Sequence, residues 1–226
     1  MGNIGTGLSG FIGSQLLTQW DISPIPHEKI AKEKLPDFDR FFFISSYGNI
    51  VTQTDHEKIL QANVLDLIHI INEAIDHPFK SFVFISTSSV KLRTQTMYSR
   101  SKRAAEEVLL SYMERFNKPI CIVRPFSVTG VGEQKEHLIP TLIRSCMTGE
   151  LVNFVPNPVH DFIDVQDVVS GITNLTDHFA RGIFELGTGR AYSNQQVLEI
   201  VESITKKKAN INIISSARPY DTDQWV

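Results

Sequence analysis

Short apolar runs alternate along the chain with longer segments in which apolar residues recur every three or four positions. The short runs are rich in Phe, Ile and Val and predict buried β-strands, whereas the longer segments predict amphipathic helices. The predicted strands are Asn3–Thr6, Ile22–Pro26, Arg40–Ser45, Ser81–Ser86, Pro119–Val123 and Ile183–Leu186. The predicted helices are Phe11–Trp20, Glu57–Asp76, Tyr98–Phe116, Leu138–Thr148, Val165–Thr176 and Ser193–Thr205. This alternation is typical of β-α units around a parallel sheet.

Two further features of the pattern concern organisation. In the helix predicted at Glu57–Asp76, one stripe of side chains is expected to be buried, namely Ile59, Asn63, Leu67, Ile70 and Ala74. Between Gly130 and His137 the strand-helix alternation is interrupted. We therefore expect a first domain over residues 1–130 and a lobe over residues 131–226, with residues 160–190 returning to the first domain.

Composition excludes several classes of protein. The 226 residues carry 22 Lys and Arg against 25 Asp and Glu, a net charge of −3, which is too balanced for a nucleic-acid binder that relies on a basic surface. The longest apolar runs are strand-sized, so no membrane span is expected, and no secretory signal is visible at the N-terminus. Two cysteines suggest neither a disulfide framework nor a metal site. A cytoplasmic setting is the default expectation.

A glycine-rich segment, Gly5–Gly13, follows the first predicted strand and opens a helix. Glycines at such a turn let backbone N–H groups approach a pyrophosphate. Two spacings fit, one starting at Gly5 and one at Gly7, and a tight turn that binds nothing is the simpler alternative. After the second predicted strand, Glu28 could bind the ribose of NAD, while His27 or Lys29 could attract the 2′-phosphate of NADP. The residues leave the choice between NAD and NADP open, with a slight preference for NAD.

Tyr98 and Lys102 are four residues apart and so share one face of a predicted helix. An ammonium close to a phenol lowers the pKa of the phenol, which allows proton exchange with a hydroxyl or carbonyl of a substrate. Such a pair alone is weak evidence, because most Tyr-x-x-x-Lys pairs lie on solvated helix surfaces.

The order of motifs resembles the extended short-chain dehydrogenase/reductases of the NAD-dependent epimerase/dehydratase group. The glycine turn comes first, and the hydroxyl-rich strand end Ser86–Ser89 stands just before Tyr98-x-x-x-Lys102. The remaining matching segments, in order, are Phe43–Ser46, Asn63–Val64, Phe84–Val90, Val123–Gly130, Asp161–Val168 and Phe184–Gly189. The resemblance covers nearly the whole chain. It implies a Rossmann-type, doubly wound α/β fold with a small, shortened C-terminal substrate lobe.

The resemblance also implies roles for residues. Tyr98 would be the acid/base, Lys102 would hold the nicotinamide ribose, and Thr87 would hydrogen-bond the reacting oxygen, although Thr87 could instead only cap its strand. The residues expected to contact NAD or NADP are Gly7, Gly10, Phe11, Ile12, Gly13, Glu28, Ser45, Ser46, Tyr98, Lys102 and Pro125. The residues expected to contact substrate are Thr87, Ser127, His160 and Arg218. Asn63, Arg124 and Asp167 are expected to be structural.

Enzymes of this group usually act on sugar nucleotides. Because Ser88 and Ser89 follow Thr87 where the family's dehydratases carry Asp-Glu, an epimerase or ketoreductase is favoured over a dehydratase. His160 replaces a familiar arginine and Ser127 a familiar asparagine. The second β-α unit, the loop between Thr87 and Tyr98, and the C-terminal region are all shorter than usual. The alternative is therefore a reduced family member that binds NAD(P) as a sensor or scaffold. Relatives pair through the helices at Glu57–Asp76 and Tyr98–Phe116, which predicts a homodimer with a four-helix bundle.

Overall fold

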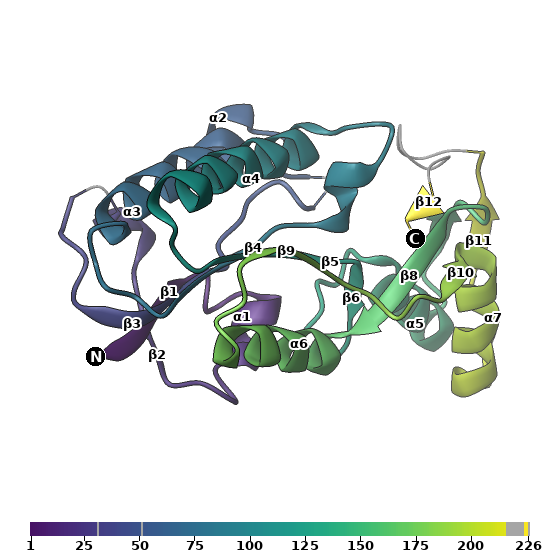
Figure 1. Cartoon of the computed structure of the whole chain (residues 1–226). Coiled ribbons are helices and arrows are strands. Elements are labelled where there is room, and N and C mark those ends of the chain that lie inside the picture. Colours follow the sequence, from purple (N-terminus) through teal and green to yellow (C-terminus); the bar gives the residue numbers. More distant parts are fainter. Residues whose placement is uncertain (31, 51, 216–223, 226) are drawn as a thin grey trace.

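The computed structural model describes residues 1–30, 32–50, 52–215 and 224–225. A six-stranded sheet in the order β2-β1-β3-β4-β5-β9 lies at its centre, and each neighbouring pair is parallel (Figure 1). Its strands are β1 (Gly2–Thr6), β2 (Ile22–Pro24), β3 (Phe38–Phe43), β4 (Ser81–Ile85), β5 (Ile120–Pro125) and β9 (Gly182–Leu186). The predicted Rossmann-type α/β fold is confirmed.

Helices cover both faces of this sheet (Figure 1). One face carries α1 (Phe11–Leu16) and α6 (Val165–Asp177), and the other carries α2 (His56–Leu60), η2 (Gln61–Leu65), α3 (Asp66–Ala74) and α4 (Met97–Phe116). Successive residues of a strand therefore pack in different cores, one on each face of the sheet. Phe41 and Phe43 pack in the core beneath α3 and α4, whereas Phe42 packs with α1 and α6 on the opposite face. Burial on both faces explains why these strands are continuous apolar runs.

The six predicted strands and six predicted helices all exist, with two informative differences. The first helix ends at Leu16 rather than Trp20, because the chain continues in tighter turns in which Thr18 N donates to Gln15 O and Gln19 N to Leu16 O. The helix predicted at Glu57–Asp76 is interrupted by the π-helical segment η2. All five residues of its expected stripe are nevertheless buried, including Asn63 at 0% exposure.

The C-terminal part contains short strands that the sequence pattern does not predict. Around β8 (Val159–Asp164) lie β6 (Ser127–Thr129), β10 (Ala191–Ser193) and β12 (Gln224–Trp225), while β7 (Val152–Phe154) pairs with β11 (Ile211–Ile213). Strands of two or three residues are too short to show an alternation of apolar and polar residues in the sequence. The helices α5 (Leu138–Thr148) and α7 (Asn194–Thr205) pack together over a separate apolar core.

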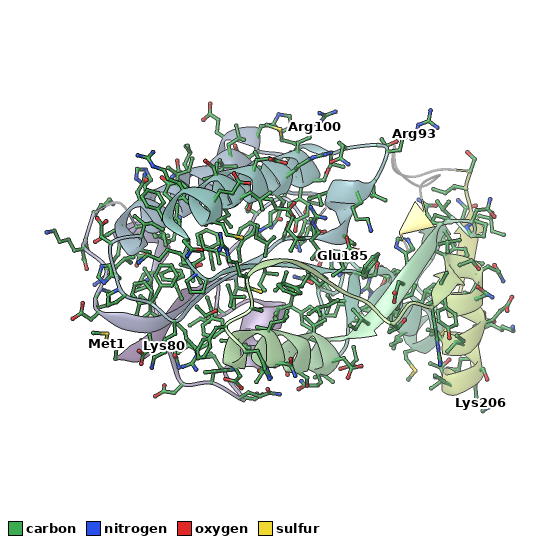
Figure 2. The ribbon with its side chains drawn as sticks, viewed as in Figure 1. Met1, Lys80, Arg93, Arg100, Glu185 and Lys206 are labelled. Atoms are coloured by element: carbon green, nitrogen blue, oxygen red, sulfur yellow. The ribbon has the colours of Figure 1, made fainter. Side chains whose placement is uncertain are left out.

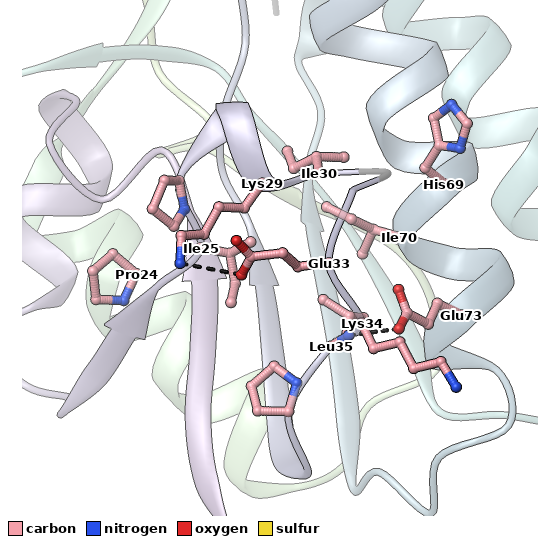
Figure 3. A pocket seen from close by; sticks show the side chains of 12 residues that line it. Pro24, Ile25, Lys29, Ile30, Glu33, Lys34, Leu35, His69, Ile70 and Glu73 are labelled. Carbon is pink, nitrogen blue, oxygen red and sulfur yellow. Dashed lines mark hydrogen bonds and ion pairs between the residues drawn. The ribbon is translucent and has the colours of Figure 1, made fainter.

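The connection between β2 and β3 is short, as expected. The 3-10 helix η1 (His27–Lys29) is its one assigned helical element among the described residues. Between this connection and α3 lies a cavity of about 380 Å³, in which Figure 3 shows the Lys29–Glu33 ion pair and the contact of Glu73 with the backbone N–H of Leu35. None of the lining residues belongs to the Tyr98 region described below.

Two observations concern expectations from composition. No helix in the described part of the chain is both long enough and apolar enough to cross a bilayer. Cys121 and Cys146 are both free and buried, and Cys121 lies fully within the sheet core as a small apolar residue.

Candidate active site

Most predicted site residues gather at the carboxyl edge of the parallel sheet. Gly7 follows β1, Ser45 and Ser46 follow β3, Thr87 follows β4, and Pro125 ends β5. The sheet order changes direction between β1 and β3, because β2 lies on one side of β1 and all later strands lie on the other. In doubly wound folds, ligands bind in the crevice at such a switch point.

The glycine turn has the conformation that the motif requires, and it resolves which spacing forms the turn. Gly5 lies within β1, so the turn is built by Gly7, Gly10 and Gly13. Gly7 has a φ of +72°, and a Cβ there would lie 2.3 Å from Ser45 N. A Cβ on Gly10 would meet only Gly7 O, at 3.2 Å. Gly10 is the N-cap residue of α1 and has no side chain to cap the helix, so the first N–H groups of the helix are available to phosphate oxygens.

Tyr98 lies in the first turn of α4, at the same edge of the sheet. The start of α4 is fixed by a reciprocal capping box between Thr96 and Ser99. Gly48 packs against Tyr98, since a Cβ on Gly48 would lie 3.4 Å from Tyr98 Cβ. No sequence pattern predicts this contact, because Gly48 lies in an irregular loop after β3.

A buried asparagine connects that loop to α4. Asn63 Oδ1 accepts from Tyr47 N at 2.9 Å, and its Nδ2 donates to Tyr47 O at 2.8 Å and to Ser101 Oγ at 2.9 Å. Ser101 Oγ donates in turn to Tyr98 O at 2.7 Å. The bulge that carries Asn63 therefore holds both the loop after β3 and the first turn of α4, in line with the structural role expected for it.

The pKa of the Tyr98 phenol is raised, whereas the sequence predicts that the Lys102 ammonium lowers it. Burial raises the pKa of Tyr98 to about 12, and hydrogen bonding with the Ser46 and Thr87 hydroxyls offsets this only in part. Lys102 does not contribute to the shift. Sequence spacing correctly placed the phenol and the ammonium on one helix face, but burial outweighs any charge effect between them.

Lys102 is completely buried. Its Nζ has no hydrogen-bond partner among the described residues and lies 4.2 Å from the centre of the Phe84 ring. Burial lowers the pKa of Lys102 to about 7, and the negative charge of Glu106 partly opposes this. A buried ammonium without an acceptor is costly. The hydroxyls of a nicotinamide ribose would supply acceptors, so Lys102 and the open glycine turn both fit a bound dinucleotide.

Thr87 caps a turn and also lies beside the Tyr98 phenol. Its Oγ1 accepts from Ser89 N at 3.2 Å and so caps the 3-10 helix η3 (Ser88–Lys91), and it also donates to Ser89 Oγ at 3.1 Å. The same hydroxyl is within hydrogen-bonding range of the Tyr98 phenol. Capping therefore orients Thr87 without removing it from the site.

The expected substrate residues are only partly described. Ser127 on β6 and His160 on β8 lie on paired strands, with Ser127 Oγ 3.1 Å from His160 Nδ1. His160 is 8% exposed. Arg218 lies outside the described residues.

The residues considered for the adenosine ribose lie on η1. Glu28 is exposed there. His27 Nδ1 is 2.8 Å from the buried carboxylate of Asp66, and Lys29 pairs with Glu33 at 3.1 Å. Both side chains that could attract a 2′-phosphate therefore contact a carboxylate.

Three polar residues beside the site were not predicted as a group. Glu106 is 1% exposed, and its carboxylate accepts from the Ser86 hydroxyl and from Arg124, at 2.9 Å to Nε and 2.5 Å to Nη2. The sequence signal was present, because Glu106 stands four residues after Lys102 on the same helix face. Its partner Arg124 was expected to be structural, which this pairing supports.

Comparison with known proteins decides the family. The model of the "NAD dependent epimerase/dehydratase family" matches residues 42–187. This chain belongs to that family. The match begins after the glycine turn, whose assignment therefore depends on the residues and geometry described above.

The curated relatives of this chain include nucleotide-sugar epimerases, a reductase and dehydratases. This chain is 23% identical to the GDP-6-deoxy-D-mannose reductase of Pseudomonas aeruginosa, and the alignment covers 91% of this chain and 81% of that enzyme. The other curated relatives align over 39% to 67% of their own lengths.

Solved structures share the fold over nearly the whole chain. MoeE5 in complex with UDP-glucuronic acid and NAD superposes with a TM-score of 0.84 at 22% identity, covering 99% of this chain and 88% of MoeE5. RMD from Pseudomonas aeruginosa, complexed with NADPH, superposes with a TM-score of 0.80 at 18% identity, covering 98% of this chain and 88% of RMD. At these identities the likeness establishes the family fold.

Proposed function

We propose that this chain binds NAD or NADP and interconverts an alcohol and a ketone on a sugar nucleotide, as an epimerase or a reductase. The observation that carries the proposal is the buried Lys102 ammonium, which has no partner among the described residues and shares a helix face with Tyr98. Both lie on α4, which begins at the sheet edge that carries the open glycine turn. The nucleotide-sugar enzymes among the relatives support the substrate class.

The cofactor would be held by groups from several strand ends. The glycine turn, with Phe11 and Ile12, would take the pyrophosphate, and Glu28 the adenosine ribose. Ser45, Ser46 and Pro125 would line the crevice, and Lys102 would donate to the nicotinamide ribose. When bound, the nicotinamide accepts or returns a hydride.

Tyr98 would move the matching proton. With a pKa of about 12 the phenol is protonated at neutral pH, so it is ready to donate when a ketone becomes an alcohol. In the reverse direction the phenol must lose its proton, and the Ser46 and Thr87 hydroxyls, which lower the pKa of Tyr98, would favour the phenolate. Thr87 would donate a hydrogen bond to the reacting oxygen.

The substrate side would use Ser127, His160 and Arg218. The first two are already joined by their side chains, so a substrate group entering there would compete with or extend that contact. The two serines after Thr87 offer hydroxyls where water elimination would need an acid and a base, which disfavours a dehydratase.

Cofactor binding and turnover test this function separately. NADH and NADPH would be titrated by fluorescence, and UDP-, GDP- and dTDP-sugars screened for turnover. Tyr98→Phe is expected to lower turnover by at least ~100-fold while leaving the cofactor Kd within ~3-fold. Tyr112→Phe, which removes a half-buried hydroxyl that contacts Asn72 on α3, is the matched control on the same helix and should retain activity. Absence of cofactor binding, or full turnover by Tyr98→Phe, would overturn the proposal.

We also propose that the chain forms a homodimer through the outer surface of α2, η2 and α4. Large apolar side chains are exposed on these elements, with Leu60 at 39%, Leu65 at 45% and Phe116 at 40%. Exposed apolar groups of this size on adjacent helices favour burial against a second copy.

A further inference from the structure

Tyr98, Lys102 and Glu106 stand one helical turn apart on α4. The 3.6-residue period places them on one face, which points into the molecule at Lys102 and Glu106. Lys102 is 0% exposed and Glu106 is 1% exposed. A buried cation and a buried anion thus follow each other directly behind the tyrosine.

The Glu106 carboxylate is held in place from two directions. The Ser86 hydroxyl on the chain after β4 donates to Oε1, and Arg124 on β5 donates to both carboxylate oxygens. Two parallel N–H···O bonds from a guanidinium fix the plane of a carboxylate. The negative charge of Glu106 therefore has a defined position relative to Lys102.

Arg124 is shared with a second carboxylate. Its Nη1 lies 3.6 Å from Glu185 on β9, and Glu185 also pairs with Lys91 at 2.9 Å. Figure 2 labels Glu185 near the centre of the view, between α4 and α6, and its side chain is exposed to solvent. Lys91 ends η3, the turn that Thr87 caps. Alternating charges consequently run from the turn beside Thr87 to the helix of Tyr98.

We propose that Glu106 is a positioning residue whose fixed negative charge favours the ammonium form of Lys102 against the effect of burial. The inference rests on the proposed function in one respect, namely that a charged Lys102 is needed to hold a nicotinamide ribose. Its physical reason is that Lys102 has lost its water and has gained no acceptor among the described residues. The Phe84 ring offers only a weak attraction to the ammonium.

The other charged or titratable groups around α4 do not replace Glu106. Tyr98 is a neutral phenol at physiological pH. Arg124 from β5 and Lys91 from η3 are cations, which would oppose a charged Lys102. Asp66 from α3 is engaged by His27 at 2.8 Å. Consistently, Glu106 is the one charged group that raises the pKa of Lys102 within the part of the chain that the structure describes.

A purely structural role for the Glu106–Arg124 pair is the competing explanation, and the charge state of Lys102 separates the two. The chain would be labelled with ¹³C at the lysine ε-carbon, and the Lys102 signal assigned by its loss in Lys102→Met. Its chemical shift would be titrated from pH 5 to 10 in the wild type, Glu106→Gln and Arg124→Met. Glu107→Gln, at the exposed neighbouring position, is the matched control.

Glu106→Gln and Arg124→Met are expected to move the midpoint of the Lys102 titration in opposite directions. Glu106→Gln keeps the size of the side chain but removes its charge and replaces one accepting oxygen by an NH2 group that cannot accept from Ser86 or Arg124, so the titration midpoint of Lys102 should fall by about one pH unit. Arg124→Met removes the competing cation, so the midpoint should rise. Glu107→Gln should leave it unchanged. Equal midpoints in wild type and Glu106→Gln, or shifts of the same sign in both variants, would overturn the proposal.

Two further measurements keep the test decisive. If Glu106→Gln does not fold, Glu106→Asp retains a charge farther from Lys102 and should give a smaller shift of the same sign. NADH affinity should fall as the pH rises, and in Glu106→Gln this fall should begin at a lower pH than in the wild type. The same pH dependence in both proteins would count against the proposal. Wild-type protein that binds no NADH refutes the proposed function, whereas the lysine titration still decides the role of Glu106.

Discussion

Gly13 in α1 faces the carbonyl oxygen of Gly7 so closely that a Cβ on Gly13 would lie 2.3 Å from it. The same Cβ would lie 2.7 Å from Leu8 Cα, so the obstacle is backbone rather than a movable side chain. The last glycine of the turn is therefore required by helix-strand packing, whereas Gly10 faces mostly open space.

Gly13→Ala is expected to lower the free energy of unfolding by about 1–3 kcal/mol and to weaken NADH binding, because α1 must move away from β1. Urea unfolding and fluorescence titration would measure both effects. Gly2→Ala is the control, since a Cβ there meets nothing within 4 Å. Equal stability of the two variants would contradict this account of the turn.

Asn63→Ala should destabilise the fold by about 2–4 kcal/mol, since it leaves the N–H and C=O of Tyr47 without their partner inside the protein. Denaturant unfolding would measure the change. Asn174→Ala, at an exposed helical position, should remain within about 0.5 kcal/mol of the wild type. A loss no larger than that of the control would show that the bulge does not anchor the loop.

Burial of Lys102 should make stability rise with pH. Its pKa is about 7 in the folded chain against 10.5 for an unperturbed lysine, so between these values the unfolded chain binds the extra proton. From pH 7.5 to 9 the free energy of unfolding should increase by about 2 kcal/mol from this group.

The comparison protein for this pH effect is Lys102→Met, which should lack the rise. Burial raises the pKa of Cys121 and of Tyr98 to about 12. A group with a raised pKa lowers the stability of the fold once the pH passes the pKa that it has in the unfolded chain. Measurements therefore stay at or below pH 9. Parallel stability curves for wild type and Lys102→Met would exclude a depressed pKa at Lys102.

Leu65→Arg is expected to convert the proposed dimer into a monomer, because it places a charge in the apolar surface that the second copy would bury. Light scattering at micromolar concentration would report the mass. Ile204→Arg, at a 75% exposed position on α7, should leave the dimer intact. A monomeric wild type would rule out the dimer.

The sequence by itself determined the features that depend on local periodicity. Consecutive apolar residues such as Phe41–Phe43 identified strands buried on both faces, and the spacing of Tyr98 and Lys102 placed them on one side of a helix. Local conformation encodes such patterns within one or two turns. The glycine turn was recognised for the same reason, although two spacings remained possible until Gly5 was seen within β1.

Tertiary structure alone decided what depends on partners distant in sequence. The raised pKa of Tyr98, the unpartnered ammonium of Lys102 and the binding of Glu106 by Arg124 all follow from which groups lose water together. The π-helical segment at Asn63 and the short strands around β8 likewise exist because of non-local hydrogen bonds. Desolvation and pairing are properties of the packed chain, because no stretch of sequence specifies its own surroundings.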